Sequence, residues 1–129
     1  MNQQSRGFTL LEVMVALAIF AVAAIALTRA GMSYTQAVSG LRDRTYAHWV
    51  LTNEAAQLRI QQAWPEGSSD QQVMWGEQQW QIHRQVYPTP VADVRRVELS
   101  AFMLTQSATE AKGDPVQRLV VFLRQPQRE

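Results

Sequence analysis

The hydrophobic pattern divides the chain into an apolar N-terminal part and a more polar remainder. From Phe8 to Leu27 the sequence is apolar over 20 residues, interrupted only by Thr9 and Glu12. A helix of that length spans about 30 Å, the thickness of the hydrocarbon core of a bilayer. The uninterrupted core, Val13 to Leu27, also lies at the upper limit for a secretory signal sequence, and Ala24-Ile25-Ala26 resembles a signal-peptidase site. Length alone therefore leaves a membrane helix and a cleaved signal sequence both open.

A second helical pattern follows this apolar run. Apolar residues recur at steps of three, four or six: Tyr34, Val38, Leu41, Ala47, Leu51, Ala55 and Leu58. This is the 3.6-residue period of an amphipathic helix. Gly31 and Gly40 each cost about 1 kcal/mol relative to alanine, but no helix stop occurs before Pro65. We therefore expect one long helix from about Phe8 to about Ala63, with its first half in lipid and its second half covering a small domain.

The remainder of the chain has the pattern of strands. Residues 64–70 (WPEGSSD) combine Pro, Gly, Ser and Asp and predict a loop. Alternating or continuous apolar positions then predict three strands: Gln79–Tyr87, Val94–Leu104 and Leu119–Leu123. Strands that follow one another along the chain favour an antiparallel sheet. The expected fold class is α+β, with a small antiparallel sheet packed on the amphipathic half of the helix.

Composition argues against an enzyme. The formal net charge is +1 and there is no cysteine, so we expect no nucleic-acid partner, disulfide or thiolate metal site. His48 and His83 are the only histidines, and neither has a carboxylate at metal-ligand spacing in the sequence. No phosphate-binding loop or nucleophile elbow is present. The sequence therefore predicts no catalytic residues, no metal and no cofactor.

Glu12 is the most informative residue of the apolar run. A carboxylate in a membrane helix costs a few kcal/mol and usually faces a partner rather than lipid. Cleavage after Gly7 would give Phe8 a free α-amine four residues before Glu12, on the same helix face. Either group could then pair with the complementary group of an adjacent subunit. The alternative is a carboxylate that extends to the membrane interface near the helix end.

The sequence Arg6-Gly7-Phe8-Thr9-Leu10-Leu11-Glu12, which runs directly into the apolar core, closely resembles the prepilin leader of type IV pilins and type II secretion pseudopilins. The resemblance implies that a prepilin peptidase of the inner membrane cuts after Gly7 and methylates Phe8. It also implies that Glu12 aligns incoming subunits. Residues 1–7 would then be a removed leader, residues 8–28 a membrane and assembly helix, and residues 29–129 a periplasmic domain.

Further residues resemble one branch of this superfamily, the minor pseudopilin I of type II secretion systems. Ala47, Trp49 and Asn53 match an Ala-x-Trp-x-x-x-Asn pattern, and Gly76 followed by Trp80 matches the start of a strand. The helix also lacks the proline that kinks the major subunits. This resemblance implies a pilin-like fold and a place in a complex at the tip of the pseudopilus. The partners would be minor pseudopilins of the J, K and H types and the major pseudopilin. The complex would start pseudopilus assembly and so support export of folded proteins across the outer membrane.

The helical and strand patterns also indicate core and contact positions. We expect Trp49, Leu51, Leu58 and Trp80 in the structural core. Tyr34, Val38 and Leu41 lie just beyond the membrane segment, where little of the domain would cover them, and are candidate contacts with other subunits.

Three rival interpretations stay open on sequence alone. The first is a minor pilin of a type IV pilus, and the second is a membrane-anchored periplasmic binding domain that is never processed. The third is a secreted enzyme behind a signal peptide, which the lack of a catalytic motif disfavours.

The leader assignment predicts the mass of the mature chain. We expect the chain isolated from its host to begin at Phe8 and to be one methyl group heavier than the unmodified sequence, as measured by intact-mass spectrometry. A chain that begins after Ala26, or at any other residue, would contradict the assignment.

Overall fold

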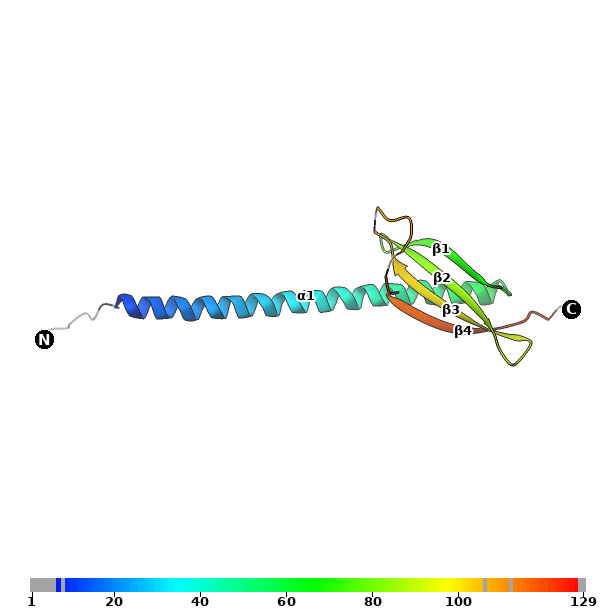
Figure 1. Cartoon of the computed structure of the whole chain (residues 1–129), viewed down its shortest axis with the longest axis horizontal. Helices are drawn as coiled ribbons and strands as arrows, with labels where there is room; N and C mark the ends of the chain where they lie inside the picture. The colour runs from blue at the N-terminus through cyan, green and yellow to red at the C-terminus, as the bar shows by residue number, and fades with distance from the viewer. Residues whose placement is uncertain (1–6, 8, 106, 112, 128–129) are drawn as a thin grey trace. The chain divides into compact units, whose positions relative to one another are not determined.

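The computed structural model describes residues 7, 9–105, 107–111 and 113–127 of the chain (Figure 1). Within them, one helix, α1 (Leu10–Ile60), precedes four strands: β1 (Ser68–Trp75), β2 (Gln78–Pro88), β3 (Val94–Met103) and β4 (Gln117–Arg124). The α+β class expected from the sequence is confirmed. Phe8, the expected mature terminus, lies outside the described residues. The chain divides into two compact units, Met1–Ser39 and Gly40–Glu129.

In the first unit, α1 is an exposed apolar helix. The Thr9 hydroxyl accepts a hydrogen bond from the Glu12 backbone N–H at 3.2 Å, an N-cap that satisfies one of the free donors of the first turn. Further along, the Thr28 hydroxyl donates to the Ala24 carbonyl at 2.8 Å, so its polar group is satisfied within the helix. α1 is long and apolar enough at this end to cross a membrane.

The second unit contains a four-stranded antiparallel sheet in the order β1-β2-β3-β4, which Figure 1 shows as adjacent strands. The β1–β2 hairpin closes through Gly76 and Glu77, both with positive φ, at 59° and 60°. These are the dihedrals that a two-residue type I′ turn requires. The ring of Tyr46 lies 3.4 Å from the position that a Cβ at Gly76 would occupy, so the turn packs closely against α1.

The core of this unit forms where α1 packs on one face of the sheet. The helix contributes residues spaced by one face of its period: Ala47, Val50, Leu51, Ala55 and Leu58. The sheet contributes alternate residues of three strands: Trp80, Ile82, Val97, Leu99, Ala101, Val121 and Leu123. Trp80 is fully buried, and its Nε1–H donates to the Trp75 carbonyl at 3.3 Å. Leu51, Leu58 and Trp80 therefore lie in the core, where the sequence pattern placed them.

Trp49 differs from the expectation, because half of its surface is exposed. The core positions of α1 follow Ala47, Leu51 and Ala55, and residue 49 falls between two of them on the opposite side of the helix. Its ring packs on Tyr46 one turn earlier, with centroids 6.1 Å apart. The assignment of Trp49 to the core is thus wrong, and Asn53, one turn beyond it, is exposed as well.

α1 ends slightly before the expected position near Ala63. The Ala63 N–H donates to the Leu58 carbonyl at 2.9 Å and the Gln62 N–H to the Arg59 carbonyl at 3.1 Å, while Gln62 adopts a φ of 50°. This pair of bonds is the Schellman motif, which stops a helix by satisfying its last carbonyls. Gln62 occupies the position in this motif that is usually a glycine. Because no glycine marks the end of the helix in the sequence, the predicted end lies a few residues late.

The segment after the helix is held by Arg95. Its guanidinium lies 4.2 Å from the centre of the Trp64 ring, donates to the Pro65 carbonyl at 2.7 Å and contacts the Glu66 carboxylate at 2.7 Å. One arginine of β3 thereby fixes the connection between α1 and β1.

Strand β1 was not predicted, and part of it was assigned to the loop at 64–70. Its sequence, SSDQQVMW, has one half-buried apolar residue, Val73, and polar neighbours, because it lies at an edge of the sheet. Pairing with β2 places Asp70 opposite His83, and Asp70 Oδ1 lies 2.8 Å from His83 Nδ1. The carboxylate partner of His83 was missed for the same reason. This hydrogen bond is the main reason that the pKa of the Asp70 carboxyl is lowered from its ordinary value, with Gln81 adding to the effect and slight burial opposing it.

The two tryptophans give a matched test of the core. We expect Trp80→Ala to destabilise the domain by about 3–5 kcal/mol, since it removes a fully buried ring. Trp49→Ala should cost about 1 kcal/mol or less, because that ring is half exposed and packs mainly on Tyr46. Urea unfolding of the full chain in detergent micelles measures both, and equal losses would contradict the assignment of the two faces of α1.

The Asp70–His83 pair predicts a pH dependence. A carboxyl with a lowered folded-state pKa adds stability above its unfolded pKa, about 3.9, and loses it as the pH falls through the folded pKa. Because both side chains are largely exposed, we expect an effect below about 1 kcal/mol.

His83→Gln should therefore raise the NMR titration midpoint of the Asp70 carboxyl toward its ordinary value. His48→Gln, which changes an exposed histidine of α1, is the matched control and should leave the midpoint unchanged. A midpoint that stays low in the His83 variant would show that another group lowers it.

Candidate assembly surfaces

The first candidate surface is the N-terminal end of α1. Glu12 lies in the first helical turn and is exposed, where the partial positive charge of the helix N-terminus favours a carboxylate. None of the ion pairs among the described residues involves Glu12. Gly7 is exposed, and no atom lies within 4 Å of the position that a Cβ there would occupy. The cleavage and methylation expected at Phe8 fall on a residue that the structure does not describe.

Behind Glu12, the apolar residues of the first unit are uncovered. Large side chains such as Leu10, Phe20 and Leu27 are exposed, which is costly in water and favourable against lipid or other apolar helices. A shallow hollow on this stretch is lined by small and branched side chains: Ala18, Ile19, Val22, Ala23 and Ala26. Small residues one turn apart allow another helix to approach closely.

The candidate contacts chosen from the sequence are also exposed. Tyr34 and Val38 belong to the first unit and Leu41 to the second, with exposed fractions of 73 %, 50 % and 68 %. Large apolar side chains with this exposure can contribute to contacts with another protein.

In the second unit, the side of α1 away from the sheet carries an outer helix stripe. It consists of exposed residues at steps of three or four: Leu41, Thr45, Trp49, Thr52, Ala56 and Ile60. The Thr45 hydroxyl donates to the Leu41 carbonyl at 2.9 Å, so the polar atom of Thr45 is already satisfied. Sequence reasoning found only the first residue of this stripe, because it assigned Trp49 to the core. The spacing of the stripe is that of a helix–helix contact.

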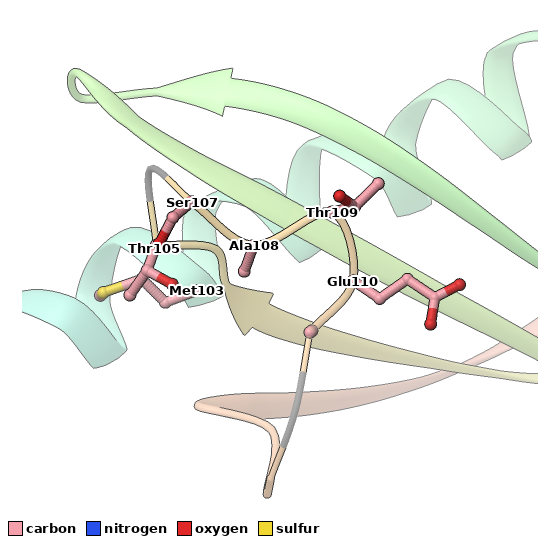
Figure 2. Close-up of a pocket in the computed structure, with 7 residues that line it drawn as sticks. Met103, Thr105, Ser107, Ala108, Thr109 and Glu110 are labelled. Atoms are coloured by element: carbon pink, nitrogen blue, oxygen red, sulfur yellow. The ribbon is translucent and has the colours of Figure 1, made fainter.

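A surface hollow next to the end of β3 has no evident chemistry among its described residues. It has a volume of about 540 Å³ and lies under the segment that follows β3. Figure 2 shows Thr105, Ser107 and Thr109 along this segment and the Glu110 side chain pointing away from Met103 and Thr105. Among the described residues that line it, Glu110 is the one that is ionisable. The described residues of its lining therefore form no acid–base pair and no metal-ligand set, and helix surfaces are the better candidates for function.

Comparison with known proteins agrees with this emphasis on the helix. The family model of type II secretion system (T2SS) protein I matches residues 41–124, and that of the prokaryotic N-terminal methylation motif matches residues 2–28. The chain is 38% identical over 96 residues to type II secretion system protein I of Pseudomonas aeruginosa, covering 74% of each protein. It is 32% identical over 129 residues to the Klebsiella pneumoniae protein of the same name, covering 98% of this chain and 100% of that protein.

A third relative, type II secretion system protein I of Aeromonas hydrophila, is 42% identical over 74 residues, which cover 57% of this chain and 60% of that protein. These relatives favour a secretion system over a type IV pilus. Because the family model spans most of the chain and the Klebsiella similarity extends over nearly all of it, the chain belongs to the type II secretion system protein I family.

Proposed function

We propose that this chain is a minor pseudopilin of a type II secretion system that acts by helix packing rather than by catalysis. In this proposal, prepilin peptidase cuts after Gly7 and methylates Phe8. The apolar part of α1 anchors the chain in the inner membrane, and the domain that follows lies in the periplasm. The chain then joins minor pseudopilins of the J, K and H types at the tip of the pseudopilus and helps to start polymerisation of the major pseudopilin.

The observation that carries this proposal is the exposed apolar stretch of α1 that begins within the methylation motif. Exposed leucine, isoleucine and phenylalanine side chains over some 18 residues are stable only against lipid or other apolar helices. A subunit that leaves the membrane to join a filament exchanges the first environment for the second. The same side chains therefore serve both as anchor and as assembly surface.

In this proposal, Glu12 determines the axial position at which two subunits pack against each other. A carboxylate at membrane depth costs a few kcal/mol unless it is paired. Cleavage after Gly7 creates an α-amine four residues away, and pairing with the amine of a neighbouring subunit would offset the cost. An unpaired Glu12 thus favours the assembled state over the free one, and only one axial position of the neighbour satisfies it.

The outer helix stripe is a second surface for contacts between subunits, and it lies on the domain. Trp49 presents a large half-exposed ring between smaller side chains, Thr45 and Thr52, on the face of α1 that the sheet leaves free. Aromatic residues are enriched where proteins meet, and a ring beside small residues fits a groove between two turns of another helix. We assign this stripe to contacts with another pseudopilin.

The role of Glu12 is testable by Glu12→Val in a host that lacks the native gene. We expect the variant to be inserted and cut normally, because the apolar stretch and Gly7 are retained, but to lose at least about tenfold in recovery of other pseudopilins after chemical cross-linking. Secretion of exported proteins should fall with it.

Thr28→Val is the matched control, since the Thr28 hydroxyl bonds only to the carbonyl of Ala24 in its own helix. It should preserve both cross-linking and secretion. If Glu12→Val assembles and secretes as well as this control, Glu12 does not align subunits. If, in addition, the native chain is not cut after Gly7, the chain is an unprocessed anchored domain instead.

A further inference from the structure

The sheet of the second unit has an edge, at β4, that the described residues leave unpaired. In the order β1-β2-β3-β4, β4 pairs on one side with β3. An edge strand presents backbone N–H and C=O groups that can pair with another strand, and proteins usually cover or charge such edges.

The register identifies which backbone groups of β4 point outward. The Gln125 N–H donates to the Asp93 carbonyl at 2.8 Å, which makes these two residues a hydrogen-bonded pair. Hydrogen-bonded pairs alternate along an antiparallel ladder, so Leu119, Val121 and Leu123 bond to β3. The backbone groups of the alternate residues, Arg118, Val120, Phe122 and Arg124, therefore point away from the sheet. None of them has a backbone partner outside the ladder among the described residues.

The side chains of the same four residues are exposed and form a simple pattern. Val120 and Phe122, exposed to 46 % and 59 %, lie between Arg118 and Arg124. Within the described part of the chain, no ion pair involves either arginine. The edge thus offers two apolar side chains flanked by two cations.

A third arginine nearby, on the outer face of β3, already has partners. Arg96, opposite Phe122 in the register, stacks 4.6 Å from the centre of the Tyr87 ring and pairs with the Glu98 carboxylate at 3.0 Å. Glu98, the carboxylate opposite Val120, is thereby occupied. The charge left available at the edge is that of Arg118 and Arg124.

A groove runs beside the C-terminal end of this edge. It has a volume of about 240 Å³ and lies between the end of α1, at Leu58, Arg59 and Ala63, and the end of β4, at Leu123 and Arg124. A strand added to β4 would direct alternate side chains to the core side of the sheet, where this groove lies. Its lining includes apolar residues such as Leu58 and Leu123, which suit a small aliphatic side chain, and two arginines, Arg59 and Arg124, which suit a carboxylate.

We propose that the edge of β4 binds an extended segment of a different polypeptide, by strand addition, and that this segment carries alternating apolar residues with Asp or Glu at its ends. Strand addition supplies affinity through the four outward backbone positions and selectivity through the side-chain pattern. This site lies on the sheet and uses no part of the membrane helix. It therefore goes beyond the proposed function and is independent of whether α1 assembles.

The charges at the edge favour a separate acidic segment over a second copy of the chain. Two β4 edges paired antiparallel about Val121 would place Arg118 directly opposite Arg124 of the other copy, and like charges in cross-strand pairs are destabilising. The β1 edge of a second copy carries Asp70, but that carboxylate already contacts His83, and the Gln72 side chain there donates to the Thr109 carbonyl. A separate acidic segment meets neither obstacle.

Amide hydrogen exchange by NMR tests the proposal on the full chain in detergent micelles. The probe is a synthetic peptide in which valine and threonine alternate between terminal glutamates. At saturation we expect exchange at the Val120 and Phe122 amides to slow by about tenfold or more, because these N–H groups gain partners. The Val121 and Leu123 amides, already bonded to β3, should change little.

Charge variants complete the test. Arg118→Glu combined with Arg124→Glu should weaken peptide binding at least about tenfold, whereas Arg44→Glu, at an exposed position of α1, should leave it unchanged. The proposal is overturned by an absence of protection at Val120 and Phe122, or by equal protection from a peptide with lysine ends. Protection that rises with protein concentration without peptide would overturn it too, since it would place a second copy at the edge.

Discussion

The packing of α1 on one face of the sheet is the interaction on which the rest of the domain depends. With no cysteine in the chain, no disulfide supports the fold, and its stability rests on apolar burial. That burial is concentrated around Trp80 and Leu51, both fully buried, with small residues such as Ala47 and Ala55 letting the helix approach the strands closely. A single helix can cover only one face of a four-stranded sheet. The β4 edge and the far side of α1 are consequently exposed, and these are the surfaces available for partners.

The surfaces left free differ in chemistry, and this difference matters for assembly. The outer helix stripe is regular and uncharged, with small side chains around Trp49, which favours another helix. The β4 edge instead offers backbone groups between two cations, which favours an acidic strand. Positive charge on an edge strand also hinders pairing between identical edges. Under the two proposals, one small domain would bind different partners on separate faces, while the arginines would disfavour pairing between the β4 edges of two copies.

The sequence was informative wherever apolar periodicity was strong. The long helix and the strands around Trp80, Val97 and Val121 followed from spacing alone, because each buries alternate or helically spaced residues. β1 was missed since an edge strand with polar neighbours has no such pattern, and with it the Asp70–His83 contact, which exists only through the β1–β2 register. Trp49 was assigned to the core because its side chain is large and apolar. The side of the helix on which a residue lies depends instead on its spacing from the core positions, and residue 49 is out of step with Ala47 and Leu51. The edge of β4 could not be predicted at all, as strand order is a property of the whole sheet.

Under the proposed function, the leader controls when Glu12 becomes useful. Before cleavage, the nitrogen of residue 8 belongs to a peptide bond and carries no charge, and the nearest cation in the sequence is the side chain of Arg6 in the leader. Removal of residues 1–7 takes away Arg6 and the original N-terminal amine and places a new amine on Phe8, four residues from an unchanged Glu12. Each subunit would then carry one group that can pair with the opposite group of the next. Methylation keeps the amine basic and therefore does not remove this charge. Proteolysis would thus not expose a new apolar surface, since the apolar face of α1 is present from the start; it would supply the missing half of an ion pair. Assembly would then be limited to processed chains by electrostatics, while the apolar helix supplies most of the binding free energy.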